Sequence, residues 1–144
     1  MRTAAESLKD EIRRAFDGVK LGDGNTLREC VALDARMDPN HPDLKSIPDY
    51  QRWQDIPDHM AEYIGSHAVL IWCERAGIKF YLPLAMTFVL SNYHGDFSSP
   101  AFHVACAIDS RERDFDLNSE QTRALESYTA YMANEYPEFF SSDA

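Results

Sequence analysis

The sequence predicts an all-α fold, a compact single-domain bundle of about six helices over residues 1–144 with its last few residues loose. Three observations lead to this prediction. Apolar residues recur at spacings of three and four, polar cap residues precede several of these runs, and glycine or proline follows them. A small β-hairpin near residues 69–82 is the alternative that the pattern leaves open.

Two helices are predicted in the first 36 residues. The first is indicated by apolar residues that share one face of a 3.6-residue period, namely Leu8, Ile12, Ala15 and Phe16. Gly18 is expected to end it. Thr26 and Glu29 have the spacing of a capping box, in which each side chain binds the backbone N–H of the other residue. The second helix is therefore expected over residues 27–36.

The next segment is expected to be mostly irregular. Residues 37–48 hold three prolines, which is typical of a loop, and residues 49–53 are expected to form a short helical turn. Asp55 has a side chain suited to an N-cap, and Pro57 suits the first turn of a helix. A third helix is therefore expected to run from there to Gly65.

The centre of the chain is its most apolar part. Residues 68–73 fit a buried strand or a buried helix, because a short apolar run does not separate the two. Pro83 is expected to be the first residue of a helix over residues 84–93, with Gly95 as its stop. That helix is apolar on nearly all sides, so we expect it to lie centrally in the core.

Two more helices are predicted toward the C-terminus. Pro100 is expected to open a short helix over residues 101–108. Asn118 and Gln121 form a second capping pair before the last helix, which Pro137 ends. The inner face of that helix is expected to consist of Leu125, Tyr128, Thr129 and Met132.

Charge is unevenly distributed along this acidic chain, whose net charge is −10. Residues 63–108 carry four charged side chains, which cancel. Residues 1–62 hold nine Lys and Arg against thirteen Asp and Glu, and residues 109–144 hold three against nine. We therefore expect the middle to form the interior and the flanks to form the surface. An acidic protein is not expected to bind nucleic acid, because phosphates attract Lys and Arg.

The compartment is predicted from three features of the sequence. The N-terminus lacks the apolar region of a signal peptide, and no apolar run approaches the ~20 residues that span a membrane. Cys30, Cys73 and Cys106 are odd in number and contain no CxxC pair, so we expect reduced thiols. Together these features predict a cytoplasmic protein without a membrane segment.

No catalytic residue, metal site or cofactor is predicted. The five histidines include no pair at the i, i+4 spacing of a helical metal site. The sequence has no GxSxG elbow and no glycine-rich loop that opens a helix after a strand. Paired acids could act in acid–base chemistry only if burial shifted their pKa values, and their polar sequence context favours solvated acids.

A partner-binding face is predicted between Asp34 and Glu62, where acids and aromatic residues occur together. Aromatic side chains anchor interfaces, and charges of one sign steer an oppositely charged partner. The alternative is a solvated acidic surface with Trp53 packed into the core. The residues predicted to contact the partner, here called the predicted face, are Asp38, Asp43, Asp49, Tyr50, Trp53, Asp55, Asp58 and Glu62.

Three motifs occur in order along the chain, WQDIP at residues 53–57, IKFYLP at residues 78–83 and LNSEQ at residues 117–121. Together they resemble a family of small acidic bacterial proteins of unknown function, over residues 8–132. The two residues that follow Pro83 depart from the family pattern, in which a small residue and an aromatic are expected. The resemblance implies no particular activity.

The predicted function is that of a non-enzymatic acidic binding protein. Its most concrete form is an immunity protein that neutralises a bacterial toxin by covering a basic or substrate-binding surface, so the expected partner is a basic toxin or enzyme domain. One alternative is a small enzyme, which would need a pocket that gathers His, Cys or acidic groups with shifted pKa values. Another is an accessory or oligomerisation domain.

Overall fold

A computed structural model describes residues 2–93, 99–109 and 116–137 of the chain. Its helices are α1 (Ala4–Ala15), α2 (Leu27–Ala35), α3 (Asp58–Ala61), α4 (Tyr63–Ser66), α5 (Val69–Trp72), α6 (Glu74–Ser91), α7 (Pro100–Asp109) and α8 (Ser119–Glu135). Two 3₁₀ turns, η1 (Pro42–Leu44) and η2 (Trp53–Asp55), lie between α2 and α3. The all-α prediction is confirmed for these ranges, in which no strand occurs.

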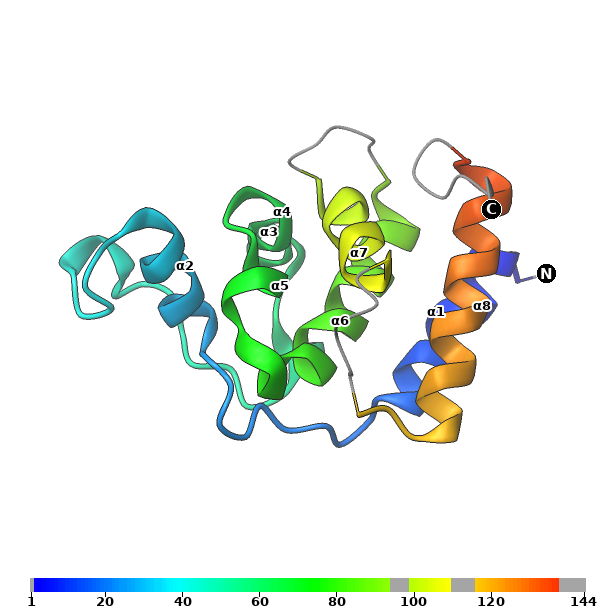
Figure 1. The fold of residues 1–144 in the computed structure, drawn as a ribbon, viewed down its shortest axis with the longest axis horizontal. Helices are drawn as coiled ribbons and strands as arrows, with labels where there is room; N and C mark the ends of the chain where they lie inside the picture. The colour runs from blue at the N-terminus through cyan, green and yellow to red at the C-terminus, as the bar shows by residue number, and fades with distance from the viewer. Residues whose placement is uncertain (1, 94–98, 110–115, 138–144) are drawn as a thin grey trace.

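The helices are spread along the long axis of the molecule in an order that differs from their order in the chain (Figure 1). α2 lies at one end, and α1 and α8 lie side by side at the other. α6 is in the middle, where it contacts α1, α3, α5, α7 and η2. In the described ranges, no helix is both long and apolar enough to cross a membrane.

The central helix is buried on all sides over residues 80–89. It continues straight through Pro83, which corrects the prediction that this proline begins a helix. Proline lacks an N–H and its ring crowds the preceding turn, at a cost of about 3 kcal/mol in a helix interior. The apolar surface buried along α6 outweighs that cost, so tertiary packing and not local propensity decides where the helix starts.

Residues 69–82 are helical, so the hairpin alternative is wrong. Their burial explains why: Val69, Leu70 and Cys73 are buried, whereas Ile71 is 57% exposed. A strand would bury alternate residues. The buried residues here are one, three and four positions apart, which is the spacing of one helix face. The helix breaks between α5 and α6, where Glu74 has a left-handed backbone with φ of 61°.

Both predicted capping pairs are confirmed. The Thr26 side chain accepts from the Glu29 N–H, and the Glu29 carboxylate accepts from the Thr26 N–H. Asn118 and Gln121 make the same reciprocal contacts at the start of α8. These pairs depend on residues three apart in sequence, which is why local reasoning finds them. The first helix was also predicted, although it starts earlier, at Ala4.

The segment before the core differs in detail from its prediction. The helical turn covers Trp53–Asp55 and not residues 49–53. Asp55 ends this turn and is not the N-cap of the next helix, because Pro57 holds that position and its carbonyl accepts from the Met60 N–H at 2.9 Å. The expected helix forms as two short pieces, α3 and α4.

Several expectations fall outside the described residues. These are Gly95 as a helix stop and the loose C-terminal end. The expected end of the central helix at residue 93 can be compared, and α6 ends earlier, at Ser91.

Candidate binding site

Trp53 of the predicted face belongs to the core. Its side chain is 2% exposed, and its Nε1 donates to the backbone oxygen of Phe16 at 3.0 Å. A buried indole needs such an acceptor for its N–H, and this bond ties η2 to the end of α1. Trp53 is therefore not available to a partner, which corrects its assignment as a contact residue and favours the alternative of core packing.

Asp49 and Tyr50 are also engaged within the chain. The Asp49 carboxylate lies 3.1 Å from Nη2 of Arg28 on α2. Tyr50 is half-buried and packs against the core, and desolvation raises the pKa of its phenol. An exposed ion pair contributes little stability, but it neutralises the charge that Asp49 would offer to a partner.

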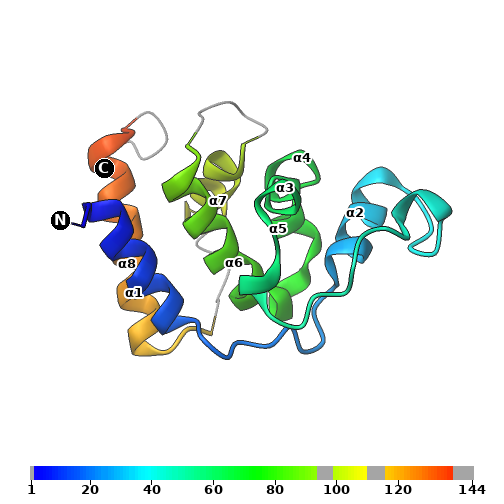
Figure 2. The ribbon, with the colours of Figure 1, turned by 180° about the vertical axis from the view of Figure 1, so that it is seen from behind.

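The five remaining acids of the predicted face are all exposed: Asp38, Asp43, Asp55, Asp58 and Glu62. None forms an ion pair with a Lys or Arg of the described ranges. They do not form one cluster. Asp38 precedes η1 and Asp43 lies within it, whereas Asp58 and Glu62 lie at the two ends of α3, in the middle of the molecule (Figure 2).

A pocket of about 140 Å³ opens between α1, η2, α3 and α6. We call it the α6 pocket because that helix supplies Leu84, Thr87, Phe88 and Ser91 to it. The Thr87 hydroxyl is turned back onto its own helix, where it donates to the Pro83 and Leu84 carbonyls at 2.9 and 3.1 Å. Leu84 and Phe88 are therefore left to form an apolar floor.

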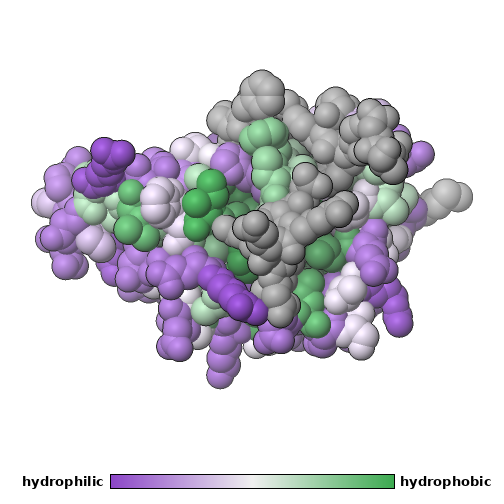
Figure 3. All heavy atoms as spheres, in the orientation of Figure 1, coloured by the Kyte–Doolittle hydropathy of each residue, from purple (hydrophilic) through white to green (hydrophobic). Residues whose placement is uncertain are grey.

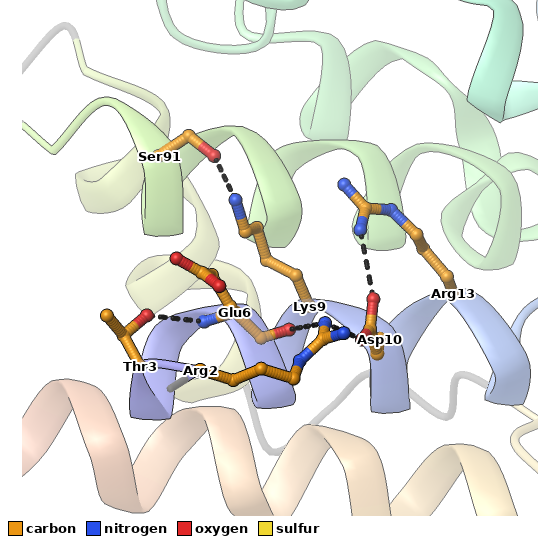
Figure 4. Close-up of polar contacts among 7 residues, drawn as sticks. All are labelled: Arg2, Thr3, Glu6, Lys9, Asp10, Arg13 and Ser91. Carbon is orange, nitrogen blue, oxygen red and sulfur yellow. Dashed lines mark hydrogen bonds and ion pairs between the residues drawn. The ribbon is translucent and has the colours of Figure 1, made fainter.

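The walls of the α6 pocket carry charge. Arg13 reaches it from α1, and Asp58 reaches it from α3. Figure 4 shows Lys9 and Arg13 both extending from α1 toward α6. The Lys9 Nζ donates to the Ser91 hydroxyl at 2.9 Å, and Nη1 of Arg13 lies 3.3 Å from the Asp10 carboxylate, which also binds Arg2.

A second polar cluster joins three helical elements. Asp34 on α2 accepts from Trp72 Nε1 on α5 at 3.1 Å, and its other oxygen lies 3.1 Å from Nδ1 of His67, the residue that ends α4. Both carboxylate oxygens are thus occupied by groups of neighbouring elements. This arrangement fixes α2 against α4 and α5, and we interpret it as structural.

His103 on α7 lies near this cluster and is half-buried. Burial lowers its pKa from the ordinary value of 6.5, and the Asp34 charge acts in the opposite direction. The folded protein therefore binds this proton less readily than the unfolded chain does. The resulting stability is present above pH 6.5 and is lost as the pH falls below that value toward the folded-state pKa.

Replacing His103 with glutamine is expected to make the unfolding free energy less sensitive to pH. Urea unfolding of both proteins between about pH 7.5 and about pH 5 measures this, because only the wild type loses stability through this imidazole. His59 is exposed and serves as the matched control. Equal pH slopes for wild type and His103→Gln would contradict the assignment.

Two of the three cysteines lie in the core. Cys30 and Cys73 are buried, and burial raises the pKa of the Cys30 thiol, so it is protonated at neutral pH. Cys106 is exposed on α7. Among the described residues, no three His, Cys, Asp or Glu side chains are placed to hold a metal ion.

One face of the molecule also shows apolar side chains. Figure 3 shows hydrophobic spheres over α2 and α5. Leu33 and Ile71 belong to these helices and are 45% and 57% exposed. Single exposed apolar residues are ordinary on protein surfaces, so we assign them no functional role.

Sequence reasoning found Asp58 but missed most of the α6 pocket. Arg13 and Ser91 are 78 positions apart in the chain, and only the packing of α1 on α6 brings them together. The charge of Arg13 carries no sign of this, because exposed arginines are common on amphipathic helices. The residues of the apolar floor are correctly predicted to belong to the core, but the sequence gives no sign that they also line a pocket.

The chain matches a family model described as a family of unknown function (DUF6714) over residues 4–141. No curated protein and no solved structure is similar enough to count as a match. The family match agrees with the resemblance to a family without an assigned activity, and it does not bear on the three motifs individually. Because the match covers nearly the whole sequence, this chain belongs to the DUF6714 family of unknown function.

Proposed function

We propose that this chain is a non-catalytic acidic protein that binds a basic protein partner. Its most concrete form is an immunity protein that neutralises a bacterial toxin by covering a basic or substrate-binding surface. The observation that supports the proposal best is the group of five exposed acids that lack a Lys or Arg partner in the described chain, namely Asp38, Asp43, Asp55, Asp58 and Glu62.

Surface acids that no Lys or Arg neutralises repel one another, so their presence favours a role outside the fold. The chain as a whole carries a net charge of −10, which adds to the local field of these acids. A field of one sign attracts an oppositely charged protein before contact and raises the association rate constant. Trp53 and Asp49 interact with other residues of this chain, so the proposal depends on the charge of the five acids.

Co-expression with toxin candidates encoded beside the gene tests the proposed function. We expect the chain to restore growth to cells that produce one of these toxins, and to elute with that toxin in size-exclusion chromatography. If it rescues none of them and none elutes with it, the immunity function is wrong.

Reversing three acids, Asp55, Asp58 and Glu62, to lysine is expected to weaken the rescue and to lower the association rate constant by about tenfold or more at low salt. The matched control reverses Glu120, Glu126 and Glu135, which are exposed on α8 and change the net charge equally. Association measured by biolayer interferometry separates the two. Equal losses in both triple variants would show that net charge, and not this surface, is recognised.

A further inference from the structure

The lining of the α6 pocket contains opposite charges, supplied by two different helices. α1 and α3 both contact α6 and lie on either side of it (Figure 2). Arg13 enters the lining from the α1 side and Asp58 from the α3 side. The lining of the pocket thus includes a cation and an anion from different helices, a combination that matches a molecule with both charges.

These two charges do not neutralise each other. The ion pair of Arg13 is with Asp10, and Asp10 is shared with Arg2. Two guanidinium groups therefore share one carboxylate, which leaves this group of three side chains with a net positive charge. Asp58 forms no ion pair within the described chain. Each wall therefore keeps charge that a ligand of the opposite sign can use.

The floor and the size of the pocket restrict the ligand further. Leu84 and Phe88 are each 5% exposed, so the apolar floor is small and the rest of the accessible lining is mostly polar. At about 140 Å³, this pocket is smaller than the roughly 300–1,000 Å³ of sites for drug-sized ligands. It fits a group with the bulk of one amino acid.

We propose that the α6 pocket binds a small zwitterion with an apolar side chain, of the class of a free aliphatic amino acid. Its carboxylate lies against Arg13 and its ammonium group against Asp58. Its side chain packs on Leu84 and Phe88. Hydrogen bonds to charged groups are stronger than neutral ones, so both ends of the ligand contribute to affinity. This site goes beyond the proposed function, and it shares Asp58 with the surface proposed to bind the protein partner.

Isothermal titration calorimetry with three related probes tests the charge requirement. L-leucine has both charges, leucinamide lacks the carboxylate, and N-acetyl-leucine lacks the ammonium group. We expect saturable binding of leucine and a loss of affinity of about tenfold or more for each of the other two, because each loses one charged contact.

Two variants then assign the charges to residues. Arg13→Gln is expected to weaken leucine and N-acetyl-leucine but to leave leucinamide unchanged, because it removes the partner of the carboxylate. Asp58→Asn is expected to show the reverse pattern. Arg14→Gln on α1 and Glu126→Gln on α8 are the matched controls, since both residues are exposed and lie outside this pocket.

The crossed pattern of probes and variants supports the proposal. Absence of saturable leucine binding by the folded wild type, whose folding circular dichroism verifies, overturns it. Leucine binding that both pocket variants leave intact overturns it as well, because the ligand would then lie elsewhere. Toxin rescue uses a different readout, so failure here and failure of the immunity function are distinguishable.

Discussion

Replacing Trp53 with alanine is expected to lower the free energy of unfolding by about 3–5 kcal/mol, the range for large-to-small changes of buried aromatic residues. The side chain is 2% exposed, so its removal leaves a cavity beside α6. It also leaves the Phe16 carbonyl without the indole N–H that it accepts at 3.0 Å. Urea unfolding followed by circular dichroism at 222 nm measures the loss.

Trp53→Phe is the matched variant because it retains an aromatic ring and removes only the N–H and part of the bulk. We expect a smaller loss than for alanine. Both proteins should retain the wild-type association rate constant with a partner wherever they remain folded. A stable Trp53→Ala protein with impaired binding would instead support the original assignment of Trp53 to the predicted face.

Replacing Gly24 with alanine is expected to lower the free energy of unfolding by about 1–3 kcal/mol, the second largest loss after Trp53→Ala. An added Cβ would lie 2.6 Å from the Gly77 Cα and 2.7 Å from its nitrogen. Both atoms belong to the backbone of α6 and cannot rotate away as a side chain can. The loop before α2 would have to lift off α6, which would strain the hydrogen bond from the Asn25 N–H to the Cys73 carbonyl at 3.3 Å.

Gly77→Ala provides the comparison from the other side of the contact. Its added Cβ would lie 3.0 Å from the Cys73 Cβ, a milder conflict. Alanine also favours a helix interior over glycine by about 1 kcal/mol, which offsets part of the cost. In thermal unfolding, the melting temperature of Gly24→Ala should therefore be lower than that of Gly77→Ala. The reverse ranking would show that the loop and α6 are not in close contact here.

What the sequence predicted well depends on nearby residues. The capping pairs, such as Thr26 with Glu29, act over three positions and are visible in any short window. The apolar stripe of α1 is equally local. Pro83 was misjudged because its penalty is local whereas the compensation comes from burial by several other elements.

The candidate site was harder to predict because its residues meet only after folding. The sequence around Trp53 does not distinguish an interface anchor from a core residue. The hydrogen bond to Phe16, which places Trp53 in the core, joins residues 37 positions apart. The sequence shows the charge of Asp58, but its place in one pocket with Arg13 depends on how α1 and α3 pack on α6. Long-range geometry of this kind has no local signature.

The proposed function depends on exposed acids that steer a basic partner to this protein. The most direct test is the association rate constant with the toxin that the chain neutralises, measured by stopped-flow fluorescence over a range of salt concentrations. Exposed charges are screened over about 8 Å at physiological ionic strength and about 3 Å at 1 M salt. We predict a steep fall in the rate constant as salt rises, with little change in the dissociation rate constant. An association rate constant that does not change with salt concentration would contradict this proposal.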